Sequence, residues 1–164
     1  MMKLRKLENK DAPFMLEWMH DKDVVKDLRK DFGSRTIRDC EYFIRESNNI
    51  KESLHLAIVN DNDEYMGTVS LKHITEKTAE FGITIRSCAM GKGYSRFGMD
   101  AILAKGFIEL GLKEIYWCVD PNNKRALRFY KKNTYQCCDA PQNANYSIEE
   151  KNYFVWFHVL SSGD

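Results

Sequence analysis

The chain has 164 residues, and its 25 Lys and Arg residues nearly balance its 24 Asp and Glu residues. This length suits a domain with a sizeable core, so we expect residues 1–164 to fold as a single domain. The near-neutral charge excludes nucleic acid and an acidic membrane surface as partners held by bulk electrostatics, and any anion site must be local.

The first part of the chain predicts one strand followed by helices. Residues 3–7 alternate in polarity, which is typical of a strand. Residues 11–28 begin with Asp11, a good helix cap, and predict either one broken helix or two short ones. After Gly33, residues 37–47 place apolar side chains three and four positions apart, which predicts another helix.

The middle of the chain changes to strand-like patterns. Residues 54–60 and 64–75 are two such runs, and the short polar sequence Asp-Asn-Asp between them favours a hairpin. Residues 78–86 alternate again after a short turn. Three consecutive strands joined by short turns predict an antiparallel meander.

The second half mixes helix and strand patterns. We expect a helix over 95–111, a strand over 113–120 and a helix over 122–133, followed by one or two strands, of which the closing one spans 153–160. The expected fold class is therefore α+β, with a mixed, largely antiparallel central sheet flanked by helices.

A glycine-rich segment separates the meander from the helix that follows it. In the sequence IRSCAMGKGYSRFGM, residues 85–99, Gly91 and Gly93 flank Lys92, and Arg96 follows. A glycine turn between a strand and a helix leaves backbone N–H groups unpaired at the helix start, where they bind phosphate oxygens well. The Walker and GxGxxG phosphate patterns both lack required residues here. The segment predicts a phosphate site of another kind.

A second segment supports that interpretation. The sequence VDPNNKRALRFYKKNTY carries Asn123, Ala126, Tyr130 and Lys132. Together with MGKGYS, it resembles the GNAT superfamily of acyl-CoA-dependent N-acetyltransferases, whose helix reads Asn-x-x-Ala-x-x-x-Tyr-x-Lys-x-Gly-Phe. The likeness extends over nearly the whole chain, and the strand segments look like those of the polyamine and ribosomal-protein acetylating branches.

The chain departs from the family pattern at three positions. Met90 stands where Arg or Gln is usual, Ser95 replaces a Gly or Ala, and Thr134 replaces a glycine. Serine is small and keeps its backbone N–H, so Ser95 spares the phosphate site, and Thr134 affects only a turn. Met90 removes a polar side chain near the expected pyrophosphate site.

The resemblance implies a site for acetyl-CoA as co-substrate. The strand before the glycine segment would line the pantetheine arm, and the loop would hold the pyrophosphate with backbone N–H groups. The residues implied are Ile83, Thr84, Ile85, Met90, Gly91, Lys92, Gly93, Tyr94, Ser95, Asn123 and Tyr130. No metal site is expected, because the cysteines and histidines form no zinc pattern.

The implied reaction is direct attack of a primary amine on the acetyl thioester. Tyr130 is carried over from the family as proton donor to the departing thiolate. A free tyrosine pKa of about 10 exceeds the roughly 8.5 of a thiol, so the phenol can donate. Some relatives hold a glutamate base where this chain has Cys118. Glu80 is the favoured substitute because its strand leads into the cleft, and Glu17 and His20 are alternatives.

The acceptor is expected to bind beside the first helices, with Glu17, His20 and Arg29 as contacts. At pH 7 a lysine amine is about 0.04% neutral and an α-amine about 10–15% neutral. Without a strong base, the expected acceptor is therefore a protein N-terminus, an amino sugar or another small amine. A competing interpretation is a CoA-binding regulatory or interaction module without catalysis, which Met90 and Cys118 support.

The five cysteines are scattered and odd in number, which argues against a disulfide framework. The N-terminal sequence lacks the apolar core of a signal peptide. We therefore expect a reduced, cytoplasmic protein. Exposed edge strands of the expected sheet permit a homodimer.

Overall fold

The three strand-like runs in the middle of the sequence form the centre of the sheet. β2 (Leu54–Val59), β3 (Tyr65–Lys72) and β4 (Thr78–Ile85) pair antiparallel in chain order, so the predicted meander is confirmed. The computed structural model of the protein describes residues 1–28, 30–47, 49 and 51–162.

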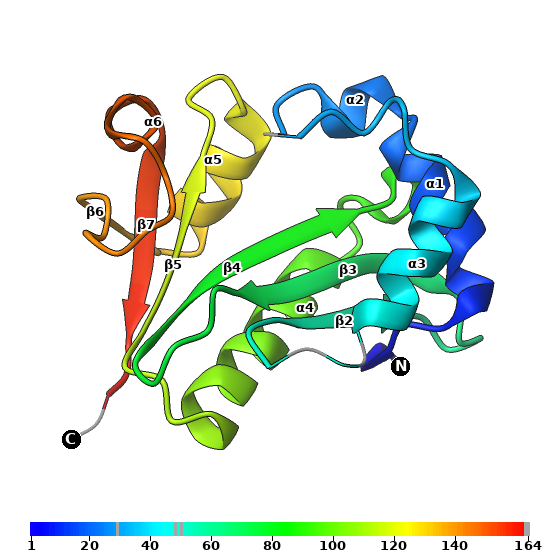
Figure 1. The fold of residues 1–164 in the computed structure, drawn as a ribbon, viewed down its shortest axis with the longest axis horizontal. Helices are drawn as coiled ribbons and strands as arrows, with labels where there is room; N and C mark the ends of the chain where they lie inside the picture. Colours follow the sequence, from blue (N-terminus) through cyan, green and yellow to red (C-terminus); the bar gives the residue numbers. More distant parts are fainter. Residues whose placement is uncertain (29, 48, 50, 163–164) are drawn as a thin grey trace.

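The remaining strands extend this sheet on both sides (Figure 1). β1 (Lys3–Lys6) pairs antiparallel with β2, and β5 (Glu114–Val119) runs parallel to β4. β7 (Val155–Leu160) and β6 (Gln136–Cys138) follow, both paired antiparallel, and the strand order is β1-β2-β3-β4-β5-β7-β6. The α+β class with a largely antiparallel central sheet is confirmed, and of the one or two strands expected after the last predicted helix, both β6 and β7 form.

One face of the sheet packs against two helices. α4 (Tyr94–Ala104), which continues as a π-helical turn over Lys105–Glu109, and α5 (Lys124–Lys132) cover this face and bury the main core. α4 approaches closely because Gly98 has no side chain, since a Cβ there would lie 2.5 Å from Ile58 Cδ1. The predicted helix over 95–111 is therefore confirmed in its position, with two kinds of helical turn.

The opposite face of the sheet is covered only at its two ends. α1 (Ala12–Met19), α2 (Lys22–Val25) and α3 (Ile37–Ser47) enclose a second core against β2 and β3. At the other end, the segment that contains α6 (Ile148–Tyr153) packs against β5 and β7. The middle of this face stays open. The predicted helix over 11–28 forms two short helices, and α6 was not predicted.

Two 3₁₀ turns, Asn9–Asp11 and Ser87–Ala89, complete the described elements. Asp11 stands at the start of α1 as predicted, but its carboxylate does not cap the helix. It is 1% exposed and accepts hydrogen bonds of 2.8 and 2.9 Å from Arg5, which joins β1 to α1. Within the described ranges, no helix is long and apolar enough to cross a membrane.

Candidate functional site

β4 and β5 separate in the middle of the open face. They pair through three residues each, 78–80 with 114–116. Beyond this point, residues 81–85 of β4 pair with β3, and residues 117–119 of β5 pair with β7. Beyond the paired residues, the backbone N–H and C=O groups on the facing edges of β4 and β5 therefore form no hydrogen bonds from one strand to the other. This is the separation that the family resemblance implies.

A cleft of about 630 Å³ follows this separation and continues across the open face. Its lining comes from α1, α3, α5 and the four central strands β2 to β5. Four of the predicted cofactor residues line it, namely Ile83, Thr84, Asn123 and Tyr130. Ile85 does not line the cleft, because it is 6% exposed and packs in the main core.

Two aromatic side chains lie where the strands separate. Tyr130 is 6% exposed, and burial raises the pKa of its phenol, which stays protonated and forms no hydrogen bond with a described residue. The ring centroid of Trp117 lies 5.3 Å from that of Tyr130. Among the described residues, Trp117 Nε1 is the one buried side-chain nitrogen or oxygen without a hydrogen-bond partner. A buried donor left unpaired costs roughly 1–3 kcal/mol, so this donor marks a place where a ligand acceptor would be favourable.

The glycine segment turns sharply between β4 and α4. Gly91 and Gly93 have φ angles of 75° and 91°, left-handed values that favour glycine. α4 begins at Tyr94 without a side-chain cap. The backbone N–H groups from Gly91 to Ser95 donate to no described residue, and they lie at the positive end of the helix dipole. Lys92 is exposed in the same turn. This geometry suits an anion.

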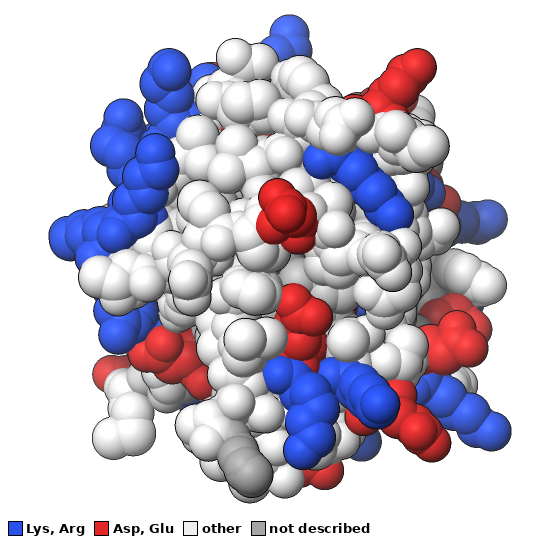
Figure 2. Space-filling model, turned by 90° about the vertical axis from the view of Figure 1, so that its left-hand side faces the viewer, with Lys and Arg blue, Asp and Glu red and all other residues white. Residues whose placement is uncertain are grey.

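α5 brings a basic surface next to this loop. Figure 2 shows Lys and Arg side chains gathered along the upper left margin of one face of the molecule. The Arg125 guanidinium contacts the Met90 sulfur, so a cation lies beside the position where the family usually has Arg or Gln. Five of the nine α5 residues are basic and none is acidic, the five being Lys124, Arg125, Arg128, Lys131 and Lys132.

A buried carboxylate lies at the last paired position of β4. Glu80 is 3% exposed and lines the cleft. The Tyr146 hydroxyl donates a 2.6 Å hydrogen bond to Glu80 Oε2, and His73 Nε2 lies 3.8 Å from Oε1. Cys118, at the position of a glutamate in some relatives, lines the same cleft. The fold therefore brings Glu80 and Tyr130 into one cleft.

Two of the predicted acceptor contacts lie outside the cleft lining. The Glu17 carboxylate accepts hydrogen bonds of 2.8 and 3.0 Å from Arg86, and this ion pair holds Glu17 away from the cleft. His20 Nε2 lies 2.9 Å from the Arg35 carbonyl oxygen and is exposed. Both residues therefore have hydrogen-bond partners in the protein, and neither is among the described residues that line the cleft. Arg29 lies outside the described residues.

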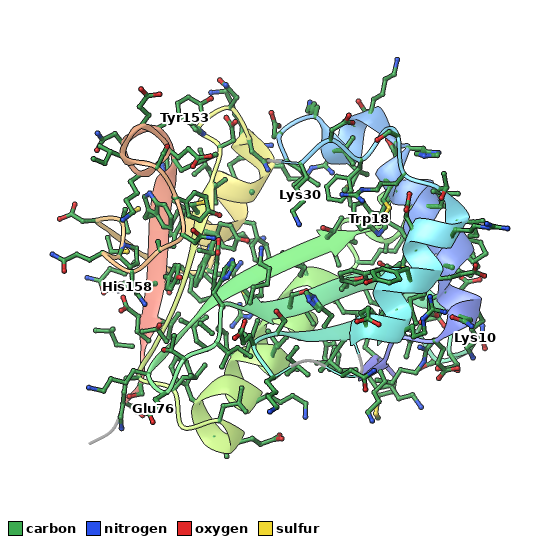
Figure 3. All side chains as sticks on the ribbon, in the orientation of Figure 1. Lys10, Trp18, Lys30, Glu76, Tyr153 and His158 are labelled. Atoms are coloured by element: carbon green, nitrogen blue, oxygen red, sulfur yellow. The ribbon has the colours of Figure 1, made fainter. Side chains whose placement is uncertain are left out.

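The cleft beneath the N-terminal helices combines aromatic and charged side chains. The rings of Trp18 and Phe32 pack edge to face at 5.0 Å and both line the cleft. Figure 3 shows the Lys30 side chain pointing from the segment after α2 toward the open face. In the described lining, carboxylates outnumber Lys and Arg by five to three, the residues being Asp27, Asp39, Glu46, Glu80, Asp120, Lys30, Arg35 and Lys72.

Comparisons with known proteins agree with this geometry. Residues 2–136 match the family described as Acetyltransferase (GNAT) domain. The chain is 29% identical to the uncharacterized N-acetyltransferase YnaD of Bacillus subtilis (strain 168) over 130 aligned residues. The aligned region covers 79% of this chain and 75% of YnaD. It is 25% identical over 138 residues to the uncharacterized N-acetyltransferase p20 of Bacillus licheniformis, covering 81% and 78%.

Solved structures share the fold over nearly the full length. Spermidine N-acetyltransferase from Vibrio cholerae, in complex with CoA and spermine, has a TM-score of 0.78 at 19% identity, covering 97% of this chain and 95% of that chain. N-acetyltransferase PseH from Campylobacter jejuni, in complex with acetyl coenzyme A, has a TM-score of 0.69 at 19% identity, covering 99% and 100%. The chain therefore belongs to the GNAT family and is an acetyl-CoA-dependent N-acetyltransferase.

Proposed function

We propose that this enzyme transfers the acetyl group to a small or terminal primary amine, which attacks the thioester directly. One observation carries the proposal. Glu80 and the protonated Tyr130 both line the cleft that follows the unpaired edges of β4 and β5. One group can accept a proton and the other can donate one. Amine acetylation by a thioester needs both, because an ammonium must lose a proton and a thiolate must gain one.

Acetyl-CoA supplies the activated acetyl group as a thioester. The free N–H groups from Gly91 to Ser95 suit its pyrophosphate, and Lys92 and Arg125 add positive charge beside them. This supports the phosphate site expected at the glycine segment. The guanidinium of Arg125 also offers a reason why Met90 is tolerated where the family usually has a polar side chain.

The separated strands suit the amide-containing arm of acetyl-CoA. The backbone of Ile83 and Thr84 lies on the unpaired edge of β4 and lines the cleft. Asn123 uses its Oδ1 to cap α5, accepting from the Ala126 nitrogen at 3.2 Å, and keeps its NH₂ group as a donor toward the cleft. The unpaired N–H of Trp117 is a further donor. Buried donors of this kind favour a ligand with carbonyl oxygens.

Two side chains move protons in the proposed reaction. Glu80 takes a proton from the ammonium of the acceptor, which leaves a neutral nitrogen to form the new bond. Tyr130 Oη donates its proton to the sulfur as the C–S bond breaks, and the phenolate takes up the second proton from the acylated nitrogen, which leaves a neutral amide and a neutral phenol. Each such group contributes typically 10²–10⁴-fold to a rate. Both side chains are buried, so the cleft keeps water from competing with the proton transfers.

The dimensions and charges of the cleft limit the acceptor. A volume of about 630 Å³ lies in the range of pockets for one small ligand, and the thioester end of acetyl-CoA occupies part of it. This supports a small molecule or the end of a peptide as the amine. The five carboxylates in the described lining favour a cationic acceptor, and spermidine N-acetyltransferase shares the fold. A protein N-terminus, an amino sugar or another small amine fits these limits.

A thiol-release assay with peptides, polyamines and amino sugars tests the function. We expect acetyl-CoA-dependent release of free CoA with at least one of these amines. Tyr130→Phe and Glu80→Gln should each lower kcat about a hundredfold, while the Kd of acetyl-CoA measured by calorimetry stays within twofold. Wild-type turnover in Tyr130→Phe would remove the acid role. Binding of acetyl-CoA without turnover on any amine would contradict the proposed reaction.

We propose the cytoplasm as the location of the enzyme. None of the five cysteines, all of which the structure describes, forms a disulfide, and two of them, Cys88 and Cys137, are exposed. Exposed thiols persist in a reducing compartment and oxidise outside it. Acetyl-CoA is also an intracellular metabolite, which supports the same location.

A further inference from the structure

A tyrosine from the C-terminal part of the chain reaches the carboxylate of β4. Tyr146 lies between β6 and α6, 66 positions from Glu80 in the sequence. Its hydroxyl donates to Glu80 Oε2 at 2.6 Å, a short bond typical of a donor to an ionised carboxylate. Both residues line the cleft. This contact therefore links the C-terminal segment to β4, the central strand of the sheet.

The Tyr146 side chain is held by its own segment. Its ring packs edge to face against Trp156 at 5.0 Å and against Phe154 at 6.0 Å. Trp156 Nε1 donates to the Lys151 carbonyl oxygen at 2.9 Å, and Lys151 Nζ donates to the Gln142 carbonyl oxygen at 2.9 Å. Ring packing against Trp156 and Phe154 thus fixes the phenol of Tyr146. The hydrogen bonds of Trp156 and Lys151 in turn hold this segment in place.

The direction of the hydrogen bond is set by the surroundings of the phenol. Burial and the negative charge of Glu80 both raise the pKa of Tyr146, so its hydroxyl keeps its proton and acts as the donor. Glu80 Oε2 is then occupied by the phenol. Oε1 has His73 Nε2 at 3.8 Å, which is beyond hydrogen-bond distance. Among the residues that the structure describes, Oε2 therefore has a hydrogen-bond donor and Oε1 has none, so Oε1 can accept from a ligand.

We infer that Tyr146 is a positioning residue, which holds Glu80 so that Oε1 faces the ammonium of the acceptor. The inference rests on the proposed function, in which Glu80 accepts that proton. A glutamate side chain has three rotatable bonds, so a carboxylate without this anchor samples several positions. Misplacement of a catalytic group by about 1 Å can lower a rate by as much as a hundredfold.

The test is a double-mutant cycle with Tyr146→Phe and Glu80→Gln. We expect Tyr146→Phe to lower kcat ten- to a hundredfold, with the KM of acetyl-CoA within twofold of wild type. In the Glu80→Gln background, the same substitution should change kcat less than twofold, because the carboxylate that it positions is absent. Tyr135→Phe, which also removes one phenolic hydroxyl from the C-terminal half, should keep wild-type kcat.

Two outcomes would overturn the inference. If Tyr146→Phe lowers kcat equally in the wild-type and Glu80→Gln backgrounds, the role of Tyr146 is structural. If Glu80→Gln lowers kcat strongly but Tyr146→Phe does not lower it, Glu80 needs no anchor. Glu80→Asp provides a second variant, because its shorter side chain withdraws from the phenol but stays a carboxylate. It should lose activity and become insensitive to Tyr146→Phe. A Glu80→Gln enzyme with wild-type kcat would instead refute the base assignment in the proposed function.

Discussion

Replacing His55 by Gln should make the stability of the protein less sensitive to acid. His55 lies on β2 under α3, where its ring packs against Phe43 at 4.7 Å and its Nδ1 lies 2.6 Å from Ser70 Oγ. Burial lowers the pKa of His55 from 6.5 to about 4, and the positive charges of Lys72 and Lys30 act in the same direction. The folded protein therefore holds this imidazole neutral at neutral pH.

The sign and size of the effect follow from the two pKa values. The unfolded imidazole takes up a proton below about pH 6.5, whereas the folded one does so near pH 4. The stabilisation is complete above 6.5 and is lost as the pH falls toward 4. One pKa unit corresponds to about 1.4 kcal/mol, so the loss relative to pH 7 is about 2 kcal/mol at pH 5 and about 3 kcal/mol at pH 4.

Urea unfolding of the wild type and of His55→Gln between pH 4 and pH 8 measures this loss. Gln carries no charge at any of these pH values, so the difference between the two curves isolates His55 from the other groups that titrate. We expect the variant to regain about 2 kcal/mol relative to wild type on going from pH 7 to pH 5. Parallel curves for His55→Gln and wild type would refute the reasoning.

Substitutions at three further sites test the loop, the helix end and the helix cap, with matched controls for the loop and the cap. Arg125→Ala should raise the Kd of acetyl-CoA about tenfold by calorimetry, whereas Lys132→Ala should change it less than threefold; equal effects would remove the specific role of Arg125. Thr134 has a φ of 61°, so Thr134→Gly should raise the free energy of unfolding by about 0.5–1 kcal/mol, and an unchanged Tm would contradict this strain. Asn123→Ala should lower the free energy of unfolding by about 1 kcal/mol, whereas Asn123→Ser keeps the cap and should leave it unchanged. Both variants lose the Asn123 NH₂ group and should weaken acetyl-CoA binding, and unchanged binding would contradict its role as a donor.

The parts of the site that sequence patterns predicted depend on local interactions. The strand, the glycine turn and α4 follow one another directly, so the free N–H groups at Gly91–Ser95 result from local backbone geometry. The end of α5 is equally local. Thr134 N donates to Lys131 O and Tyr135 N donates to Tyr130 O, both at 3.0 Å, the pattern that places a left-handed residue after a helix. This explains why the family has glycine at position 134.

The parts that were missed depend on contacts between distant residues. Glu17 is drawn to Arg86 across 69 positions and Tyr146 to Glu80 across 66, and no local pattern encodes either pair. α6 does have a local signal in the sequence, because Ser147 and Glu150 form a capping box at its start. That signal marks the start of a helix directly after Tyr146, but it carries no information about Glu80, the partner of this tyrosine.

The spacing of Asn123 and Tyr130 connects the strand separation to the proposed chemistry. Seven residues are close to two turns of α-helix, so the cap and the phenol lie on the same side of α5, and both line the cleft. Under this face, Tyr130 packs against Trp117 and Phe157 at 5.3 and 5.2 Å, and Trp117 packs against Phe81 at 5.4 Å. These rings join α5, β4, β5 and β7 beneath the opening, so its walls are packed before any ligand binds. A shift of α5 by one residue would rotate the phenol by about 100° away from the cleft, and the cap at Asn123 prevents that shift by fixing where the helix begins.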